Sequence, residues 1–192
     1  MIRCENLSDA DLSRIGSQIG DAFLAEPGVF SALPEDIAHR LFTLIARTGY
    51  ETGHLYTTGE NQEGFCIYWT KDQRPGLWVQ LRMGLKMARI LPLKLGLRMK
   101  NSQNNWTPTE KRYAKHEDFV EVFLLAVRTE YQGKGFFREM LRDPFELAKQ
   151  RNTICVLDTD TKCKAEKYSH VGMHVVASSP QRSGITMYAL EI

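Results

Sequence analysis

The feature that most constrains the fold is a nine-residue apolar run, FVEVFLLAV, at residues 119–127. A strand with one face in water alternates apolar and polar side chains. This run does not, so it predicts a central strand covered on both faces. Residues 135–150 then have the spacing of a helix, and TICVL at 153–157 reads as a second buried strand. A helix that joins two buried strands predicts one parallel pair with a crossover connection.

The segments on either side predict hairpins and helices around this unit. Ser8 is expected to cap a first helix, and a second helix should begin near Pro34 and end near Gly49. Residues 54–70 and 173–192 each alternate around a turn, as hairpins do. The sequence therefore predicts an α/β fold with a mixed, mostly antiparallel central sheet and helices on both faces, in a single domain spanning residues 1–192.

A short glycine-containing loop follows the apolar run. Gly133 and Gly135 flank Lys134 where the strand turns into the helix. Glycine permits positive φ and lets backbone amides approach a ligand, and the first amides of a helix attract anions. The loop is consistent with a pyrophosphate cradle or with a plain strand–helix turn. It lacks the Lys-Ser/Thr of a P-loop, and Arg138 stands where a dinucleotide fingerprint has its third glycine.

The segment LLAVRTEYQGKGFFREML, at residues 124–141, resembles the central motif of the GNAT N-acetyltransferase superfamily. In that motif a strand runs into [QR]-x-x-G-x-[GA] and then a helix. Gln132 and Gly135 match its first two fixed positions, whereas Phe137 stands where the family usually has Gly or Ala.

A later stretch, residues 157–176, is similar to the family's segment of strand, short helix and Y-x-x-x-G-[FM]. Tyr168, Gly172 and Met173 match that pattern. Lys164 stands where one branch of the family has Asn, so no role of that Asn is carried over. The strong resemblance covers about residues 119–176.

The resemblance implies a GNAT-like acyl-CoA N-acyltransferase fold, in which the two parallel strands splay apart and acetyl-CoA is the cosubstrate. Backbone groups of Leu125 and Val127 would then bind the pantetheine arm, and the loop amides would bind the pyrophosphate. The Lys134 side chain could reach either phosphate or solvent. The residues assigned to the cosubstrate are Leu125, Ala126, Val127, Gln132, Gly133, Lys134, Gly135, Phe136 and Phe137.

Two residues are candidates for catalysis under this resemblance. Tyr168 would protonate the departing thiolate, or else it packs at a helix end. Glu121, within the apolar run, would accept the proton of an ammonium substrate, or else it is a buried carboxylate held by an ion pair. His116 and Glu117, just upstream, are weaker candidates for the same role.

A basic segment separates the first hairpin from the apolar run. Residues 73–109 contain no acidic side chain, and residues 74–112 predict a helical insertion, with a second helix starting at Pro92. It could form a substrate lid that disfavours polycationic acceptors, a membrane- or partner-docking face, or a solvated basic surface. Its basic residues are Arg74, Arg82, Lys86, Arg89, Lys94, Arg98 and Lys100.

Composition narrows the class of protein. The four cysteines form no C-x-x-C pair and have no histidine at ligand spacing, so no metal site is predicted. The N-terminus lacks a signal-peptide pattern, and no apolar run is long enough to span a membrane, so we expect a cytoplasmic protein. A net charge of +2 does not by itself argue for nucleic acid, and because the positive charge is confined to one segment and no reader motif is present, we do not expect nucleic-acid binding. A homodimer is compatible with the sequence.

The sequence therefore predicts an acetyl-CoA-dependent N-acetyltransferase. The acceptor is a small-molecule or peptide amine, attacked directly in a ternary complex, since neither Cys155 nor Cys163 has a base partner that would mark an acyl-enzyme nucleophile. The alternatives are a non-catalytic acyl-CoA-binding module and a membrane- or partner-docking protein that uses the basic segment.

Overall fold

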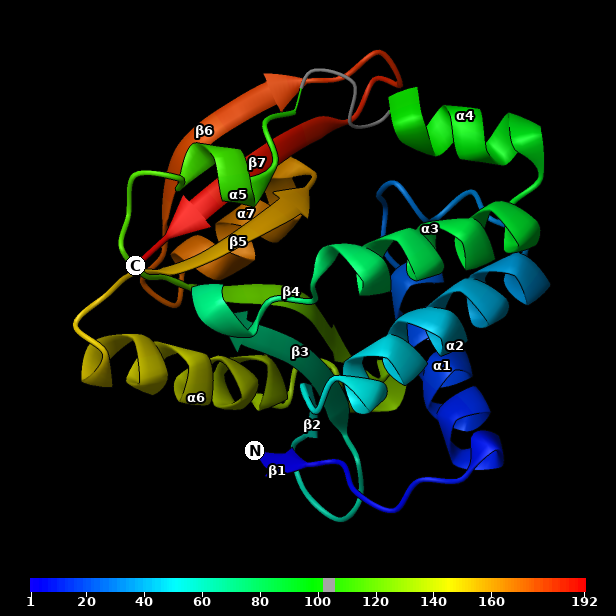
Figure 1. Cartoon of the computed structure of the whole chain (residues 1–192), viewed down its shortest axis with the longest axis horizontal. Helices are drawn as coiled ribbons and strands as arrows, with labels where there is room; N and C mark the ends of the chain where they lie inside the picture. The colour runs from blue at the N-terminus through cyan, green and yellow to red at the C-terminus, as the bar shows by residue number, and fades with distance from the viewer. Residues whose placement is uncertain (102–105) are drawn as a thin grey trace.

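Figure 1 shows the computed structural model, in which one twisted sheet carries helices on both faces. The structure describes the backbone of residues 1–101 and 106–192, and their side chains except those of residues 98–101 and 110. The elements in chain order are β1 (Ile2–Arg3), α1 (Asp9–Leu24), α2 (Glu35–Glu51), β2 (Leu55–Thr57), β3 (Gly64–Thr70), η1 (Lys71–Gln73), α3 (Leu77–Ile90), α4 (Leu93–Asn101), α5 (Thr109–Arg112), β4 (Val120–Val127), η2 (Thr129–Tyr131), α6 (Phe136–Gln150), β5 (Cys155–Asp160), α7 (Lys162–Ser169), β6 (His174–Pro180) and β7 (Thr186–Glu191).

The sheet is mixed, as the sequence predicts. The strand order is β1-β2-β3-β4-β5-β7-β6, with β4 at the centre. The pair β4–β5 is parallel, and α6 makes the connection between these strands, whereas the other neighbouring pairs are antiparallel. The predicted fold class is therefore confirmed.

Local signals set the ends of the first two helices. Ser8 caps α1 by accepting a hydrogen bond from the Asp11 amide, while the Asp11 carboxylate accepts one from the Ser8 amide. Pro34 precedes α2 as predicted, but the helix runs past Gly49 to Glu51. Gly49 is buried inside the helix, next to Ile67 of β3. Glycine is needed at this position because a Cβ there would lie only 2.7 Å from Cδ1 of Ile67.

The core has two main layers, one on each face of the sheet (Figure 1). On one face α1 and α2 pack on β2, β3 and β4, with Phe65, Ile67 and Trp69 of β3 pointing toward them. On the other face α6 and α7 pack on the opposite side chains of β3, β4 and β5. The central strand is therefore buried on both faces, except that Phe123 is 44% exposed.

A β-bulge interrupts the central strand at Phe123. Ile67 of β3 pairs with Leu124 and Tyr68 pairs with Val122, so Phe123 has no partner. Before the bulge Val120 donates a hydrogen bond to Ile154 on the β5 side. The extra residue reverses the alternation of the strand, both of its side chains and of its backbone groups.

The parallel pair separates soon after it forms. Val120 pairs with Cys155 and Glu121 with Val156, and no further pair is formed along the rest of the two strands. The strands therefore splay from the bulge onward, as the resemblance implied.

Residues 74–112 are largely helical in the described part. The helices α3 and α4 meet at Pro92, and α3 packs against α2 on the same face of the sheet (Figure 1). Among the described helices, none combines the length and the apolar character that crossing a bilayer would require.

Candidate active site

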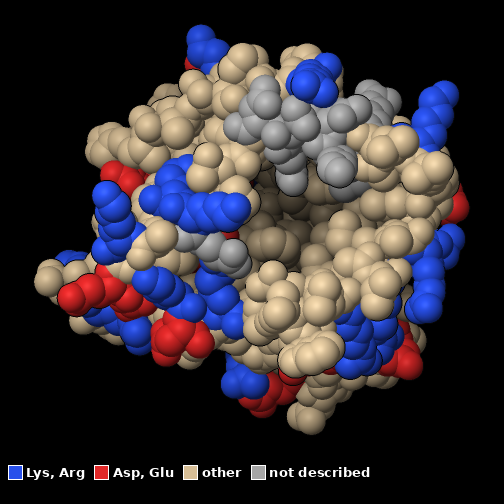
Figure 2. Space-filling model, turned by 45° about the horizontal axis from the view of Figure 1, so that its top comes forward, with Lys and Arg blue, Asp and Glu red and all other residues tan. Residues whose placement is uncertain are grey.

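A cavity of about 1060 Å³ lies where β4 and β5 separate. Its walls come from the splayed strands, the loop before α6, helices α1, α2 and α7, and the segment from α3 to α5. Figure 2 shows the molecule hollowed near its centre, with a lining that is mostly uncharged. A hollow of this size could hold the reacting ends of two substrates.

The glycine loop lies at one end of this cavity. Gly133 and Gly135 have φ of 74° and 92°, in the left-handed region, and nothing lies within 4 Å of either missing Cβ. Within the described part of the chain, the amides of residues 133–137 donate no hydrogen bond. Because Gly135 also precedes the first turn of α6, these amides and the helix dipole present partial positive charge together.

The open edge of β4 adds hydrogen-bonding groups beside this loop. The Arg128 amide donates to the Glu63 carbonyl, on the β3 side. Since alternate residues turn their backbone groups to opposite edges, Leu125 and Val127 face the gap toward β5. The Val127 carbonyl accepts a hydrogen bond of 3.3 Å from Gln132 Nε2, which ties the loop to the strand.

Glu121 lines the cavity and is 6% exposed. Its Oε2 accepts a hydrogen bond of 2.7 Å from Trp69 Nε1 and lies 3.1 Å from Arg74 Nε. Burial raises the pKa of this carboxyl above its usual value, while Arg74, Trp69 and Thr109 oppose part of that shift. The structure thus combines the two sequence-based interpretations, because Glu121 has an ion-pair partner and also faces the cavity.

Tyr168, at the end of α7, also lines the cavity. Burial raises the pKa of its phenol, and the nearby carboxyl groups of Glu26 and Asp160 add to the shift. Its ring lies 5.0 Å from the ring of Phe137, centroid to centroid. Phe137, which departs from the GNAT motif, therefore has a structural place: it packs against the candidate acid.

Sequence reasoning missed a second carboxylate, Asp158 of β5. It accepts hydrogen bonds of 2.6 Å from Trp106 Nε1, 3.3 Å from Thr109 Oγ1 and 2.6 Å from an Arg112 nitrogen. These partners lie about 50 residues from it in the chain. No local pattern could have found the group, because only the packing of the segment before β4 against β5 assembles it.

A second feature that the sequence did not show is the aromatic wall. Phe23, Phe30 and Phe42 contact one another with ring centroids 4.7–5.5 Å apart, and all three line the cavity. Met83 and Met87 of α3 continue this wall. The apolar periodicity of the helices that carry the other wall residues is visible in the sequence, whereas Phe30 lies between α1 and α2, and no such pattern distinguishes a cavity wall from ordinary core.

Other candidate residues lie elsewhere. His116 and Glu117 are exposed and do not line the cavity. Lys134 places its Nζ 5.4 Å from the Tyr131 ring centroid, and Lys164 pairs with Asp160 at 2.7 Å.

The basic segment contributes little charge to the cavity. Of its described cations, Arg74 lines the wall, whereas Arg82, Lys86, Arg89 and Lys94 do not. Arg98 and Lys100 have side chains outside the described residues. The expectation that this charge selects against polycationic acceptors therefore has no support from the described lining.

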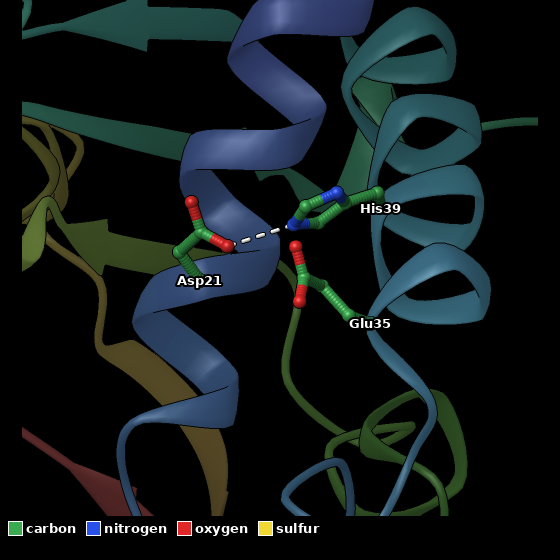
Figure 3. Close-up of side chains that lie close together, drawn as sticks. All are labelled: Asp21, Glu35 and His39. Carbon is green, nitrogen blue, oxygen red and sulfur yellow. Dashed lines mark hydrogen bonds and ion pairs between the residues drawn. The ribbon is translucent and has the colours of Figure 1, made fainter.

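A separate surface group joins α1 and α2. Asp21, Glu35 and His39 each offer a ligand atom, and these atoms lie within 4.8 Å of one another (Figure 3). His39 Nε2 lies 2.7 Å from Asp21 Oδ1. This hydrogen bond between two packed helices accounts for the group, which lies away from the cavity lining.

Comparisons with known proteins test the fold. No family model matches the sequence, and no curated protein matches it. Solved structures do match. An arylalkylamine N-acetyltransferase 2 from Aedes aegypti aligns over 98% of this chain and 96% of its own, with 12% identity and a TM-score of 0.62. An N-acetyltransferase from Staphylococcus aureus Mu50 aligns over 100% of both chains, with 16% identity and the same TM-score of 0.62.

A third structure carries the family name. It is an acetyltransferase of the GNAT family from Desulfovibrio desulfuricans, which aligns over 94% of this chain and 90% of its own, with 9% identity and a TM-score of 0.53. At these identities the likeness concerns the fold. Together with the splayed parallel pair and the bulged central strand, it supports one conclusion: the chain has the GNAT acetyltransferase fold.

Proposed function

We propose that this protein transfers an acetyl group from acetyl-CoA to the amine of an apolar acceptor, by direct attack in a ternary complex. One observation carries the proposal. Among the described residues, the amides of residues 133–137 donate no hydrogen bond, and their loop lies at the end of a cavity that Glu121 and Tyr168 also line.

The residues present fit acetyl-CoA. The amides of residues 133–137 and the start of α6 suit a pyrophosphate, and the open edge of β4 at Leu125 and Val127 suits the amides of a pantetheine arm. When bound, acetyl-CoA supplies an acyl group activated as a thioester. The side chain of Lys134 is not required for this fit, since backbone groups provide the donors.

Glu121 and Tyr168 then have complementary roles. The acceptor ammonium gives its proton to the Glu121 carboxylate, directly or through water, and its nitrogen forms a bond to the acetyl carbon. As the carbon–sulfur bond breaks, the Tyr168 hydroxyl gives its proton to the departing sulfur. The nitrogen, now bonded to the acetyl carbon, releases its second proton, which returns through water to the Tyr168 phenolate. The raised pKa of each group favours its part, because it makes Glu121 a stronger base and keeps Tyr168 protonated.

Direct transfer also agrees with the state of the cysteines near the sheet. Burial raises the pKa of the Cys155 thiol to about 12, and it raises that of Cys66 as well. A thiol with a raised pKa stays protonated near neutral pH, and it is then a poor nucleophile because the thiolate is the attacking species. An acyl-enzyme intermediate on either residue is therefore disfavoured.

The wall of the cavity supports an apolar or aromatic amine. Phe23, Phe30, Phe42, Met83 and Met87 provide a continuous hydrophobic surface. The lining cations are already paired: Arg74 with Glu121, Lys164 with Asp160 and Lys167 with Glu26. The free energy of acceptor binding is therefore expected to come mainly from apolar burial.

The test is a titration followed by a turnover assay. Calorimetry should show micromolar binding of acetyl-CoA and CoA to the wild type. An amine screen that detects released CoA thiol should then find turnover with apolar amines. Tyr168→Phe should lower kcat by about 100-fold or more while the affinity for acetyl-CoA stays unchanged. Binding without turnover of any amine would favour the non-catalytic acyl-CoA module. Failure of the folded wild type to bind would overturn the proposal.

A further inference from the structure

Helix α3 has apolar side chains on two faces. One set, Met83, Met87 and Ile90, is half-buried and packs against the core that contains α2, and Met83 and Met87 also line the cavity. A second set is exposed on the outside. Leu77 (69% exposed), Leu81 (50%) and Leu85 (65%) recur every four residues on α3, with Trp78 (83%) beside Leu77, and Leu93 (81%) and Leu97 (52%) are exposed on α4. We call these six residues the outer apolar stripe.

A row of cations borders this stripe. Arg82, Lys86 and Arg89 follow one another at spacings of four and three residues, so they form a neighbouring line on α3. None of them forms an ion pair with another described residue, and neither does Lys94 of α4. We call these four residues the basic row.

The basic row continues into a groove of about 540 Å³ between α1, α2 and α3. Lys86 and Arg89 line it from α3, and Arg40 and Arg47 line it from α2. Arg47 also pairs with Asp9 at 2.7 Å. Residues 73–109 contain no acidic side chain, whereas the rest of the chain has more acidic than basic residues, so positive charge is concentrated on this face.

We propose that α3 and α4 dock on the surface of an anionic lipid bilayer. The outer apolar stripe would enter the interface between headgroups and acyl chains, where Trp and Leu side chains are favourable. The basic row and the cations of the groove would lie against the lipid phosphates. An amphipathic helix with a basic border is the pattern that binds in this way.

The composition favours a membrane over a protein partner. Protein interfaces are depleted in lysine, and their charged side chains usually meet opposite charges. Here Lys86 and Lys94 lie beside the leucines, and no acidic side chain among the described residues forms an ion pair with the cations of the row. A surface that supplies many negative charges next to an apolar layer matches both features at once.

The docking face and the cavity share the same helices. Met83 and Met87 line the cavity from α3, and Gly96 lines it from α4. Docking would therefore place the cavity about one helix diameter, roughly 10 Å, from the bilayer. The binding itself does not rest on the proposed acetyl transfer, so the two can fail separately.

The experiment is co-sedimentation of the full chain with vesicles, without acetyl-CoA. Phosphatidylcholine vesicles are compared with vesicles that contain 30% phosphatidylglycerol, at low and at high salt. We expect binding to the anionic vesicles, little to the neutral ones, and a loss of binding at about 0.5 M salt, where screening removes the contribution of the basic row.

Two pairs of variants separate the features. Arg82→Gln with Arg89→Gln should weaken partitioning about 25-fold, since each cation near an anionic surface contributes roughly fivefold. Its matched control changes Arg142 and Lys149 of α6 to Gln. Leu81→Glu should abolish binding, whereas Val176→Glu on β6, which is similarly exposed, should not. All four variants should keep the wild-type circular dichroism spectrum.

Three results would overturn the proposal. They are no binding of the wild type to anionic vesicles, equal binding to neutral and anionic vesicles, or binding that none of the α3 variants changes. Concentration-dependent dimerisation that Leu81→Glu abolishes, with no vesicle binding, would instead assign this face to a second copy of the chain.

Discussion

The two ends of the cavity are built in different ways. At one end, consecutive backbone amides at residues 133–137 converge at the start of α6. At the other end, side chains from β3, β4, β5 and the segment before β4 converge around Glu121 and Asp158. The first end depends on the local conformation of one loop, and the second depends on how distant segments pack.

This difference separates the two substrates. A backbone cradle recognises phosphate whatever the neighbouring side chains are, provided that glycine allows positive φ. A wall of side chains from several elements can change its shape without disturbing that cradle. Changes at one end should therefore affect acetyl-CoA and changes at the other should affect the acceptor, and this separation can be measured.

The largest effect is expected at the side-chain end. Glu121→Gln should lower kcat by about 100- to 1000-fold and leave acetyl-CoA affinity unchanged, because a general base is lost while the side-chain shape stays. Steady-state kinetics and calorimetry measure the two quantities. Glu117→Gln, an exposed carboxylate outside the cavity, is the matched control and should change neither.

The same variant tests the pH dependence. Burial raises the pKa of Glu121, so its carboxylate forms at a higher pH than that of an exposed glutamate. For the wild type, kcat/KM should rise with pH through that raised pKa, and this part of the profile should be missing in Glu121→Gln. If the rise persists in the variant, the base is a different group, and Asp158 is the next to test.

The next largest effect is expected at the backbone end. Changing Gly133 and Gly135 together to Ala should weaken acetyl-CoA binding at least about 10-fold, since alanine at positive φ costs roughly 1–2 kcal/mol per residue. Gly184→Ala is the control: its φ is 84°, nothing lies within 4 Å of its missing Cβ, and it lies in the β6–β7 turn. Equal loss of affinity in both proteins would contradict the cradle.

A smaller effect is expected on the apolar wall. Met87→Ala should raise KM for an apolar amine about 10-fold, because the side chain offers roughly 1.5 kcal/mol of apolar contact. The KM for acetyl-CoA should stay within about twofold. Initial-rate measurements with each substrate varied in turn would show this, and an equal rise in both constants would break the separation between the two ends.

The smallest effect is expected where the two ends meet. Phe137→Ala should lower kcat about threefold to tenfold, since an aromatic contact is worth roughly 0.5–1.5 kcal/mol and here it positions Tyr168. Acetyl-CoA affinity should change little, because the Phe137 amide remains. In a Tyr168→Phe background the same substitution should have almost no further effect on kcat, and an additive effect would show that Phe137 acts by another route.

Much of the backbone end was predictable because its determinants are consecutive in the chain. The strand–glycine–helix order gives the loop its conformation, and the positive φ of Gly133 and Gly135 confirms that part of the prediction. The cap at Ser8 is a similar case, since it involves residues three apart. Gly49 shows the limit of such signals. It resembles a helix end in the sequence, yet it lies inside α2, where the lack of a side chain lets the helix pack closely against Ile67.

The sequence by itself determined the elements, their order around one parallel crossover, and the glycine-containing loop before α6, because each rests on patterns within a few residues. Only the tertiary structure decided that the bulge at Phe123 turns Leu125 and Val127 to the open edge, and that Trp69 and Arg74 hold Glu121. It also decided which face of α3 is buried. The reason is physical: burial and electrostatic environment depend on contacts between segments that are far apart in the chain, and no local pattern encodes them.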